Sequence, residues 1–128
     1  MAQHSPLAGT WKLVAYEQWS QGAAAYPMGR DAQGYIAYDP CGWMSVQIMR
    51  AGRPSPAADG YLAYAGSYEV DEAQATVTHH IALHLQPNAI GSHLVRRFAV
   101  HGSRLTLFTS PTVSDPPEGG RLTWERIP

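Results

Sequence analysis

The sequence predicts an all-β protein: an eight-stranded antiparallel up-and-down β-barrel formed by a single domain over residues 1–128. Three observations predict it. Twelve glycines and ten prolines separate short runs rich in Tyr, Val, Ile, Leu, Thr and Trp, a composition typical of strands joined by turns. Side-chain character alternates along these runs with a period of two. With 45% hydrophobic and 15% charged residues, 128 residues suffice for one buried core.

Eight segments follow the period of two and are expected to be strands. They are Gly9–Trp19, Gly34–Asp39, Trp43–Arg50, Tyr61–Val70, Ala75–Leu85, His93–Val100, Arg104–Ser110 and Arg121–Ile127. The sequence Asp39-Pro40-Cys41-Gly42 has proline and glycine at the second and fourth positions of a tight turn. Hairpin connections are expected at 70–73 and 100–103, and longer loops over 20–33, 51–60 and 111–120.

Strands joined mainly by hairpins favour a sheet that closes on itself, because closure removes its unpaired edges. A barrel of eight strands is just wide enough to hold one small ligand. A sandwich of seven or eight strands fits the same strand pattern, so counting strands leaves that alternative open.

Composition excludes several classes of partner. The net charge of -1 and the pI of about 6.6 give no positive field for nucleic acid or an anionic membrane surface. No segment approaches the roughly 20 apolar residues that span a bilayer. The single cysteine, Cys41, excludes an internal disulfide, and the start MAQHSPLAGTW lacks the pattern of a signal peptide. We therefore expect a cytoplasmic protein.

The first strand carries a family resemblance. Gly9-x-Trp11 resembles the signature of lipocalins and fatty-acid-binding proteins, the calycin group. The segments GTWKL, YPMGRDAQGYIAYDPCGWMSVQIMR, YLAYAGSYEVD, VTHHIALHLQPN and LTWERI together resemble the small bacterial lipocalin-like domain family over nearly the whole chain. The resemblance implies that Trp11 lies across the closed end of the barrel beside a basic side chain of the last strand, for which Arg126 is the candidate. It also implies uptake of apolar or amphipathic small molecules.

The first strand also supplies candidate ligand-binding residues. If Trp11 points inward, the period of two turns Glu17 and Trp19 inward as well. A carboxylate inside the barrel needs a partner, and Glu17 is a candidate polar anchor or general base with a raised pKa. A bulge in the strand would instead turn Glu17 away from the interior.

Two further ionisable residues are expected at inward positions. His79 shares the apolar face of its strand with Val77, Ile81 and Leu83. Arg96 likewise lies among apolar residues and would need an anionic partner, either Glu17 or a ligand carboxylate. A one-residue bulge would replace His79 by His80 or Arg96 by Arg97, so the sequence leaves both choices open.

Tyrosines and one face of the third strand complete the candidate site. Tyr38, Tyr64 and Tyr68 each offer ring area and a hydroxyl that can orient an amphipathic ligand. On the third strand, Trp43, Ser45, Gln47 and Met49 share a face. From it we select Gln47 as a polar contact and Met49 as part of the apolar wall.

The sequence thus predicts a barrel that binds a small hydrophobic or amphipathic metabolite. The alternative is a cofactor-independent cyclase, isomerase or dehydratase of a polyketide- or terpenoid-like substrate, with Glu17 or His79 as acid/base and Arg96 stabilising negative charge. A third interpretation is a filled barrel that works through its surface, as a homodimer or an accessory to another enzyme, using Trp43. No cofactor is expected, and no metal site either, because neither an HxH nor a CxxC spacing occurs.

Overall fold

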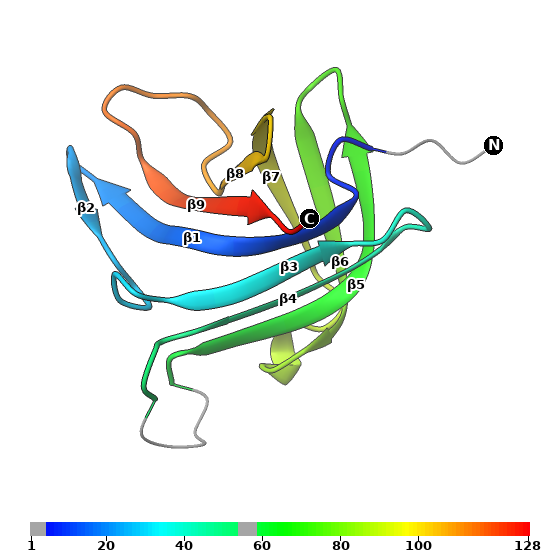
Figure 1. The fold of residues 1–128 in the computed structure, drawn as a ribbon, viewed down its shortest axis with the longest axis horizontal. Coiled ribbons are helices and arrows are strands. Elements are labelled where there is room, and N and C mark those ends of the chain that lie inside the picture. The colour runs from blue at the N-terminus through cyan, green and yellow to red at the C-terminus, as the bar shows by residue number, and fades with distance from the viewer. Residues whose placement is uncertain (1–4, 54–58) are drawn as a thin grey trace.

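The structure is a computed structural model that describes residues 5–53 and 59–128 (Figure 1). Its elements in chain order are β1 Gly9–Ser20, β2 Ala23–Ala25, β3 Gln33–Tyr38, β4 Trp43–Met49, β5 Tyr61–Asp71, β6 Thr76–His84, the 3-10 turn η1 Pro87–Ala89, β7 His93–His101, β8 Arg104–Phe108 and β9 Gly119–Arg126. All eight predicted strands are present, with ends shifted by a few residues. The predicted loop 51–60 includes residues 54–58, which lie outside the described ranges.

The sheet closes into a barrel. Its strands follow the order β2-β1-β3-β4-β5-β6-β7-β8-β9, all pairings are antiparallel, and β1 also pairs with β9 from Trp11↔Arg126 to Trp19↔Gly119. This last pairing joins the first and last strands (Figure 1). It confirms the predicted eight-stranded barrel and excludes the sandwich. The short β2, which pairs only with the end of β1, was not predicted.

Strand β1 leaves a gap beside β3, because the two pair only over Gly9–Lys12. The segment 26–32 leads into β3, and its Met28 and Ala32 pack against the buried core. Among the described residues, no helix has the length and apolar content needed to cross a bilayer.

Trp11 and Arg126 seal one end of the barrel. Trp11 is fully buried, and its indole N–H donates to the carbonyl oxygen of Leu7 at 2.9 Å. The Arg126 guanidinium lies 4.1 Å from the centre of the Trp11 ring and donates to the carbonyl oxygens of Ala8 and Pro6. The expected cation–π contact is therefore confirmed, with a contribution of about 0.5–2 kcal/mol.

A β-bulge in β1 overturns the inward placement of Glu17 and Trp19. The pairing with β9 steps from Leu13↔Trp124 to Ala15↔Thr123, so Val14 has no partner. One extra residue exchanges the two faces of the strand. Beyond the bulge, Glu17 and Trp19 therefore point to the outside of the barrel.

A second bulge lies in β6 at Ala82, between the pairs Gly66↔Ile81 and Ala65↔Leu83. It turns Leu83, expected inside, to the surface with 67% exposure. It also presses the β6 backbone against β5, so that a Cβ at Gly66 would lie only 1.7 Å from the carbonyl oxygen of His80. Only glycine fits at this position.

Strand β4 faces inward with the set of residues opposite to the one selected from the sequence. Met44, Val46 and Ile48 are 2–3% exposed and belong to the core. Gln47 and Met49 consequently lie on the outer surface, and their expected inward placement was wrong. The physical reason is hydrophobic: the Met-Val-Ile face is wholly apolar, whereas its opposite carries Ser45 and Gln47.

Candidate functional site

A cavity of about 110 Å³ lies inside the barrel, toward the end opposite the Trp11 seal. Each of the eight barrel strands contributes to its mostly apolar lining. The lining residues are Tyr16, Ile36, Val46, Ile48, Leu62, Tyr64, His79, His84, Leu94, Arg96, Leu107, Thr109, Leu122 and Trp124. Most come from the ends of β4, β6 and β8 and the beginnings of β5, β7 and β9, which meet at this end of the barrel.

His79 lies at the inner boundary of the cavity and is 1% exposed. The hydroxyl of Tyr38 lies 2.6 Å from its Nε2, and the hydroxyl of Tyr64 lies 2.8 Å from its Nδ1. A neutral imidazole has one donor and one acceptor nitrogen, so one tyrosine accepts a hydrogen bond and the other donates one. Both ring nitrogens are therefore satisfied within the barrel wall.

Burial keeps this cluster uncharged. Desolvation, assisted by the Arg96 charge, lowers the pKa of His79 to about 3. Burial also raises the pKa of Tyr64 to about 12 and that of Tyr38 well above its ordinary value. At neutral pH the imidazole and both phenols are neutral, and His79 has no nitrogen left to remove a proton from a ligand.

His84 reaches the cavity because of the β6 bulge. Its ring stacks on Tyr64, with 5.5 Å between centroids and 2° between planes. The backbone N–H of Gln86 donates to His84 Nδ1 at 2.8 Å, so a neutral ring carries its proton on Nε2. His84 therefore offers an N–H donor at the cavity.

The sequence left open whether Arg96 or Arg97 faces the interior. Arg96 is the one whose cationic side chain lines the cavity. Among the described residues its hydrogen bond is a long one, 3.4 Å, to the carbonyl oxygen of Val95. No acidic side chain is among the lining residues. The neighbouring Arg97 points outward, where it lies over the ring of Phe108 and donates to Ser110 and Thr112 carbonyl oxygens.

Trp124 adds an unused donor. It is 1% exposed, lines the cavity, and its buried indole N–H has no acceptor within the described ranges. Buried N–H groups are nearly always paired. The cavity thus combines the Arg96 guanidinium and the His84 imidazole with a mostly apolar wall, to which the Trp124 ring contributes.

The structure divides the candidate residues selected from the sequence. Tyr64, His79 and Arg96 line the cavity, and Tyr38 supports it from behind through His79. Tyr68 is only partly buried; it lies edge-on to Tyr38 with 4.9 Å between ring centroids, and donates to the carbonyl oxygen of Asp39. It does not border the cavity.

The other four candidates, Glu17, Trp19, Gln47 and Met49, lie on the outer surface. Glu17 accepts a hydrogen bond from Arg121 Nε at 2.9 Å, and the Arg121 guanidinium also lies 5.2 Å from the Trp19 ring centroid. Glu17 therefore has its cationic partner outside the barrel, where it cannot neutralise Arg96.

Sequence reasoning missed Tyr16, His84 and Trp124 as cavity residues. Tyr16 and His84 enter only because of the two bulges. Trp124 was recognisable, because it alternates with Leu122 in the closing LTWERI and so shares its inward face. Within the described ranges, no three His, Cys, Asp or Glu side chains gather where they could hold a metal ion.

The arrangement of seal, barrel and cavity agrees with a comparison against known families. The chain matches the lipocalin-like domain family over residues 8–127. It belongs to this family. The matched range contains both the Trp11–Arg126 seal and every residue that lines the cavity of this lipocalin-like domain. A search of curated proteins gave no match.

Proposed function

We propose that this lipocalin-like domain binds a small, mainly apolar molecule that carries a carboxylate, with the carboxylate held against Arg96. The observation that carries the proposal is an arginine in an apolar cavity whose lining contains no acidic residue. Arg96 is half-buried. A partly desolvated guanidinium gains from an anionic partner, and a carboxylate matches its fork of donors. Since Glu17 is paired outside the barrel, a ligand is the remaining source of that anion.

The other donors support the same ligand chemistry. The Nε2–H of His84 is available to an acceptor, and the buried indole N–H of Trp124, a cavity residue, has no acceptor among the described residues. Two carboxylate oxygens can accept about four hydrogen bonds, which suffices for these groups together with Arg96. An amine or a neutral hydrocarbon would leave them unpaired.

The cavity volume limits the ligand. A buried apolar cavity of about 150 Å³ holds one benzene molecule, and this cavity measures about 110 Å³. The enclosed part of the ligand is therefore no larger than one ring or a short alkyl chain. A longer acid would place its carboxylate end inside and extend through the open end of the barrel.

Binding explains the site better than the acid/base alternative does. Of the three residues expected to act on a substrate, Glu17 lies outside the barrel and His79 has both nitrogens occupied by tyrosine hydroxyls. Of the three, Arg96 alone both lines the cavity and keeps donors that the described residues leave largely unused. An arginine alone supplies charge stabilisation but no general base.

The proposal is tested by titrating the protein with pentanoate and with 1-pentanol, which have equal chain length and differ in charge. Calorimetry or NMR shifts should show the acid binding about 10- to 100-fold more tightly, the range expected for charge-assisted hydrogen bonds of about 1.5–3 kcal/mol. Arg96→Met should abolish this preference. Lys12→Met removes one positive charge from the outer surface and serves as the matched control.

Equal affinity for the acid and the alcohol in the wild type would contradict the proposal, and so would a preference that survives Arg96→Met. The same variant has a second readout. Because Arg96 has no anionic partner among the described side chains, its replacement by an apolar side chain should leave the free energy of unfolding unchanged or raise it by about 0.5–2 kcal/mol. A large loss of stability would show that Arg96 serves the fold.

A further inference from the structure

One patch of the outer barrel surface carries no charged side chain among the described residues. It comprises the outward residues at 33–37 of β3, 43–49 of β4 and 61–67 of β5, together with Leu83 of β6, and is called the β3–β6 outer face below. Tyr35, Trp43 and Leu83 are 46%, 53% and 67% exposed on it. Leu85 and Ile90 extend it beyond the end of β6.

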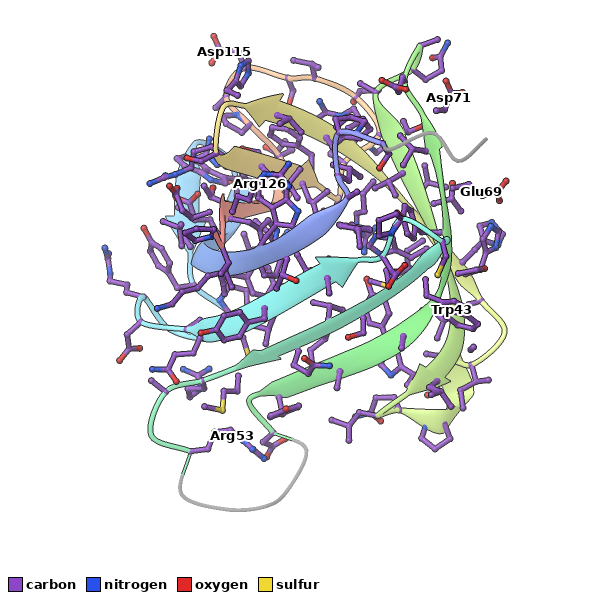
Figure 2. The ribbon with its side chains drawn as sticks, turned by 45° about the vertical axis from the view of Figure 1, so that its right-hand side comes forward. Trp43, Arg53, Glu69, Asp71, Asp115 and Arg126 are labelled. Carbon is purple, nitrogen blue, oxygen red and sulfur yellow. The ribbon has the colours of Figure 1, made fainter. Side chains whose placement is uncertain are left out.

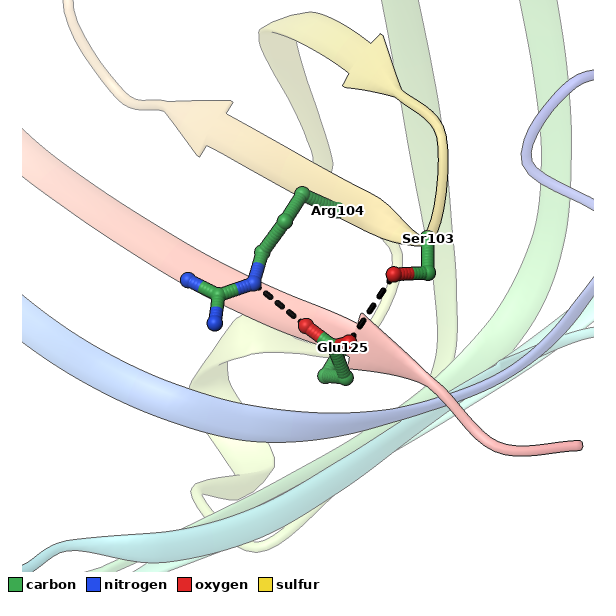
Figure 3. Close-up of polar contacts among 3 residues, drawn as sticks. All are labelled: Ser103, Arg104 and Glu125. Atoms are coloured by element: carbon green, nitrogen blue, oxygen red, sulfur yellow. Dashed lines mark hydrogen bonds and ion pairs between the residues drawn. The ribbon is translucent and has the colours of Figure 1, made fainter.

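The opposite side of the barrel differs in that its outer surface carries charged side chains. There, charged side chains pair with one another along neighbouring strands, as between Arg121 of β9 and Glu17 of β1. Figure 3 shows another such group, in which Glu125 of β9 accepts hydrogen bonds from the Arg104 guanidinium and the Ser103 hydroxyl. The absence of charge on the β3–β6 outer face is therefore a local property.

This face is also grooved. A hollow of about 400 Å³ runs over Gly34 between Tyr35, Met49 and Tyr61, and a second of about 310 Å³ runs over Ala63 and Ala65 between Leu83 and Ile90. Small residues form the floors and large apolar residues the walls. Gln47 borders both hollows and so lies near the middle of the face.

We propose that the β3–β6 outer face is a dimer interface, on which two copies of this chain pack across a two-fold axis. In a two-fold dimer the same patch meets itself, so residues near the axis face their own copies. A charge there would repel its copy, whereas an uncharged face with ridges and hollows can pack against itself. Depletion of charge in the centre with charges at the rim is the usual composition of protein interfaces.

The charges at the two ends of the face also favour a second copy of this chain as the partner. Asp39, Glu69 and Asp71 lie at the end where β3 stops and β5 leaves the face. At the other end, Arg30, Arg50 and Arg53 outnumber Asp31 and Asp59. Figure 2 shows Arg53 at one end of the sheet and Trp43, Glu69 and Asp71 toward the other. A two-fold axis that lies in the plane of the interface, perpendicular to the strands, places the acidic end of one copy over the basic end of the other.

The size of the face sets the expected strength. Three strands about 4.8 Å apart and about seven residues long at 3.3 Å each cover a flat area of ~330 Å². The height of the side chains and the contributions of Leu83, Leu85 and Ile90 add to this area. The face is therefore smaller than the ~600 Å² per partner of small interfaces, so the dimer should be weak and concentration-dependent.

Sedimentation velocity on the whole protein, from about 10 µM to about 1 mM, covers the affinities expected of such an interface. The wild type should pass from monomer to dimer in this range. Gln47→Lys and Leu83→Lys each introduce a charge that meets its own copy, at exposed positions that the fold does not need, and should weaken association at least tenfold. Val113→Lys adds the same charge at an 82% exposed position on the distant 111–118 loop and should behave as the wild type.

A wild type that stays monomeric at every concentration would overturn the proposal, including the case in which it sediments with lipid vesicles instead. A dimer that survives both face variants would show that another surface associates. Cys41, the single cysteine, lies in the β3–β4 turn beside the face. A spin label there should report an intermolecular distance in the wild type that disappears in Leu83→Lys.

Discussion

The buried imidazole of His79 predicts that the protein loses stability when the pH falls below neutral. In the unfolded chain His79 has the ordinary histidine pKa of 6.5, and in the barrel burial lowers the pKa to about 3. A folded pKa below the unfolded one means that the unfolded state takes up the proton first. The stabilising contribution is therefore complete above pH 6.5 and is lost as the pH falls from 6.5 toward 3.

The two pKa values give the magnitude. One proton taken up by the unfolded state alone changes the free energy of unfolding by about 1.4 kcal/mol per pH unit. Between pH 7.5 and 5.5 the expected loss is also about 1.4 kcal/mol, because half of this interval lies above the unfolded pKa. Extended to pH 3, it would reach about 4 kcal/mol, a large part of the stability of a domain of this size.

Urea unfolding at half-unit steps between pH 7.5 and 5.5 measures this loss. The window stays above the range in which Asp39 and Glu125 titrate, whose pKa values hydrogen bonds lower further. His79→Phe should remove the loss, whereas the control His101→Gln, at an exposed outer position, should retain it. In NMR spectra of the wild type, the ring of His79 should stay neutral down to pH 4.5.

The reasoning would be refuted if the wild-type unfolding free energy were constant across this window. It would also be refuted if the loss persisted in His79→Phe, or if the His79 ring titrated near its ordinary pKa. Each result would show that water reaches the imidazole and that the tyrosine cluster does not exclude charge.

Two substitutions test the packing around the cavity. Tyr38→Phe removes the hydroxyl that faces His79 Nε2. It should lower the free energy of unfolding by about 1–3 kcal/mol, because a buried nitrogen loses its partner. If urea unfolding shows no change beyond experimental error, water replaces the phenol hydroxyl. Gly66→Ala forces a methyl group into the His80 carbonyl and should cost about 3 kcal/mol or more by thermal unfolding. Gly102→Ala has open space but a φ of 61° and should cost only about 1–2 kcal/mol, so equal losses would contradict the close approach.

The barrel was predictable because its information is local and repeated. Each strand has its own alternation, and the glycines and prolines mark the turns between strands. The seal was predictable for a related reason: Trp11 and Arg126 occupy fixed places in the first and last strands, and closure of the sheet brings those strands together.

The inside of the barrel was harder to predict. Side chains alternate between the two faces of a strand, and one extra residue exchanges the inward set for the outward set. The bulges at Val14 and Ala82 each shift a strand by one residue, and neither residue type marks a bulge. These shifts turned Glu17 outward and brought His84 inward. The error at Gln47 was of another kind, since the wholly apolar opposite face of β4 was visible in the sequence.

Partners across the barrel could not be predicted from the pattern at all. Tyr38 and His79 are 41 residues apart in the chain and meet only in the folded protein. The same holds for Glu17 and Arg121, whose ion pair lies outside the barrel, so that Glu17 cannot serve as the anion for Arg96.

The central claim is that the barrel encloses a space in which Arg96 meets a ligand carboxylate. Crystals of the protein soaked in 3-bromopropanoate and measured at the bromine absorption edge test it most directly, since the bromine locates the ligand. The account predicts a bromine peak inside the barrel, among Tyr16, Leu62 and Trp124, with the carboxylate on Arg96. Bromine found only in the outer grooves, with side chains filling the interior, would contradict it.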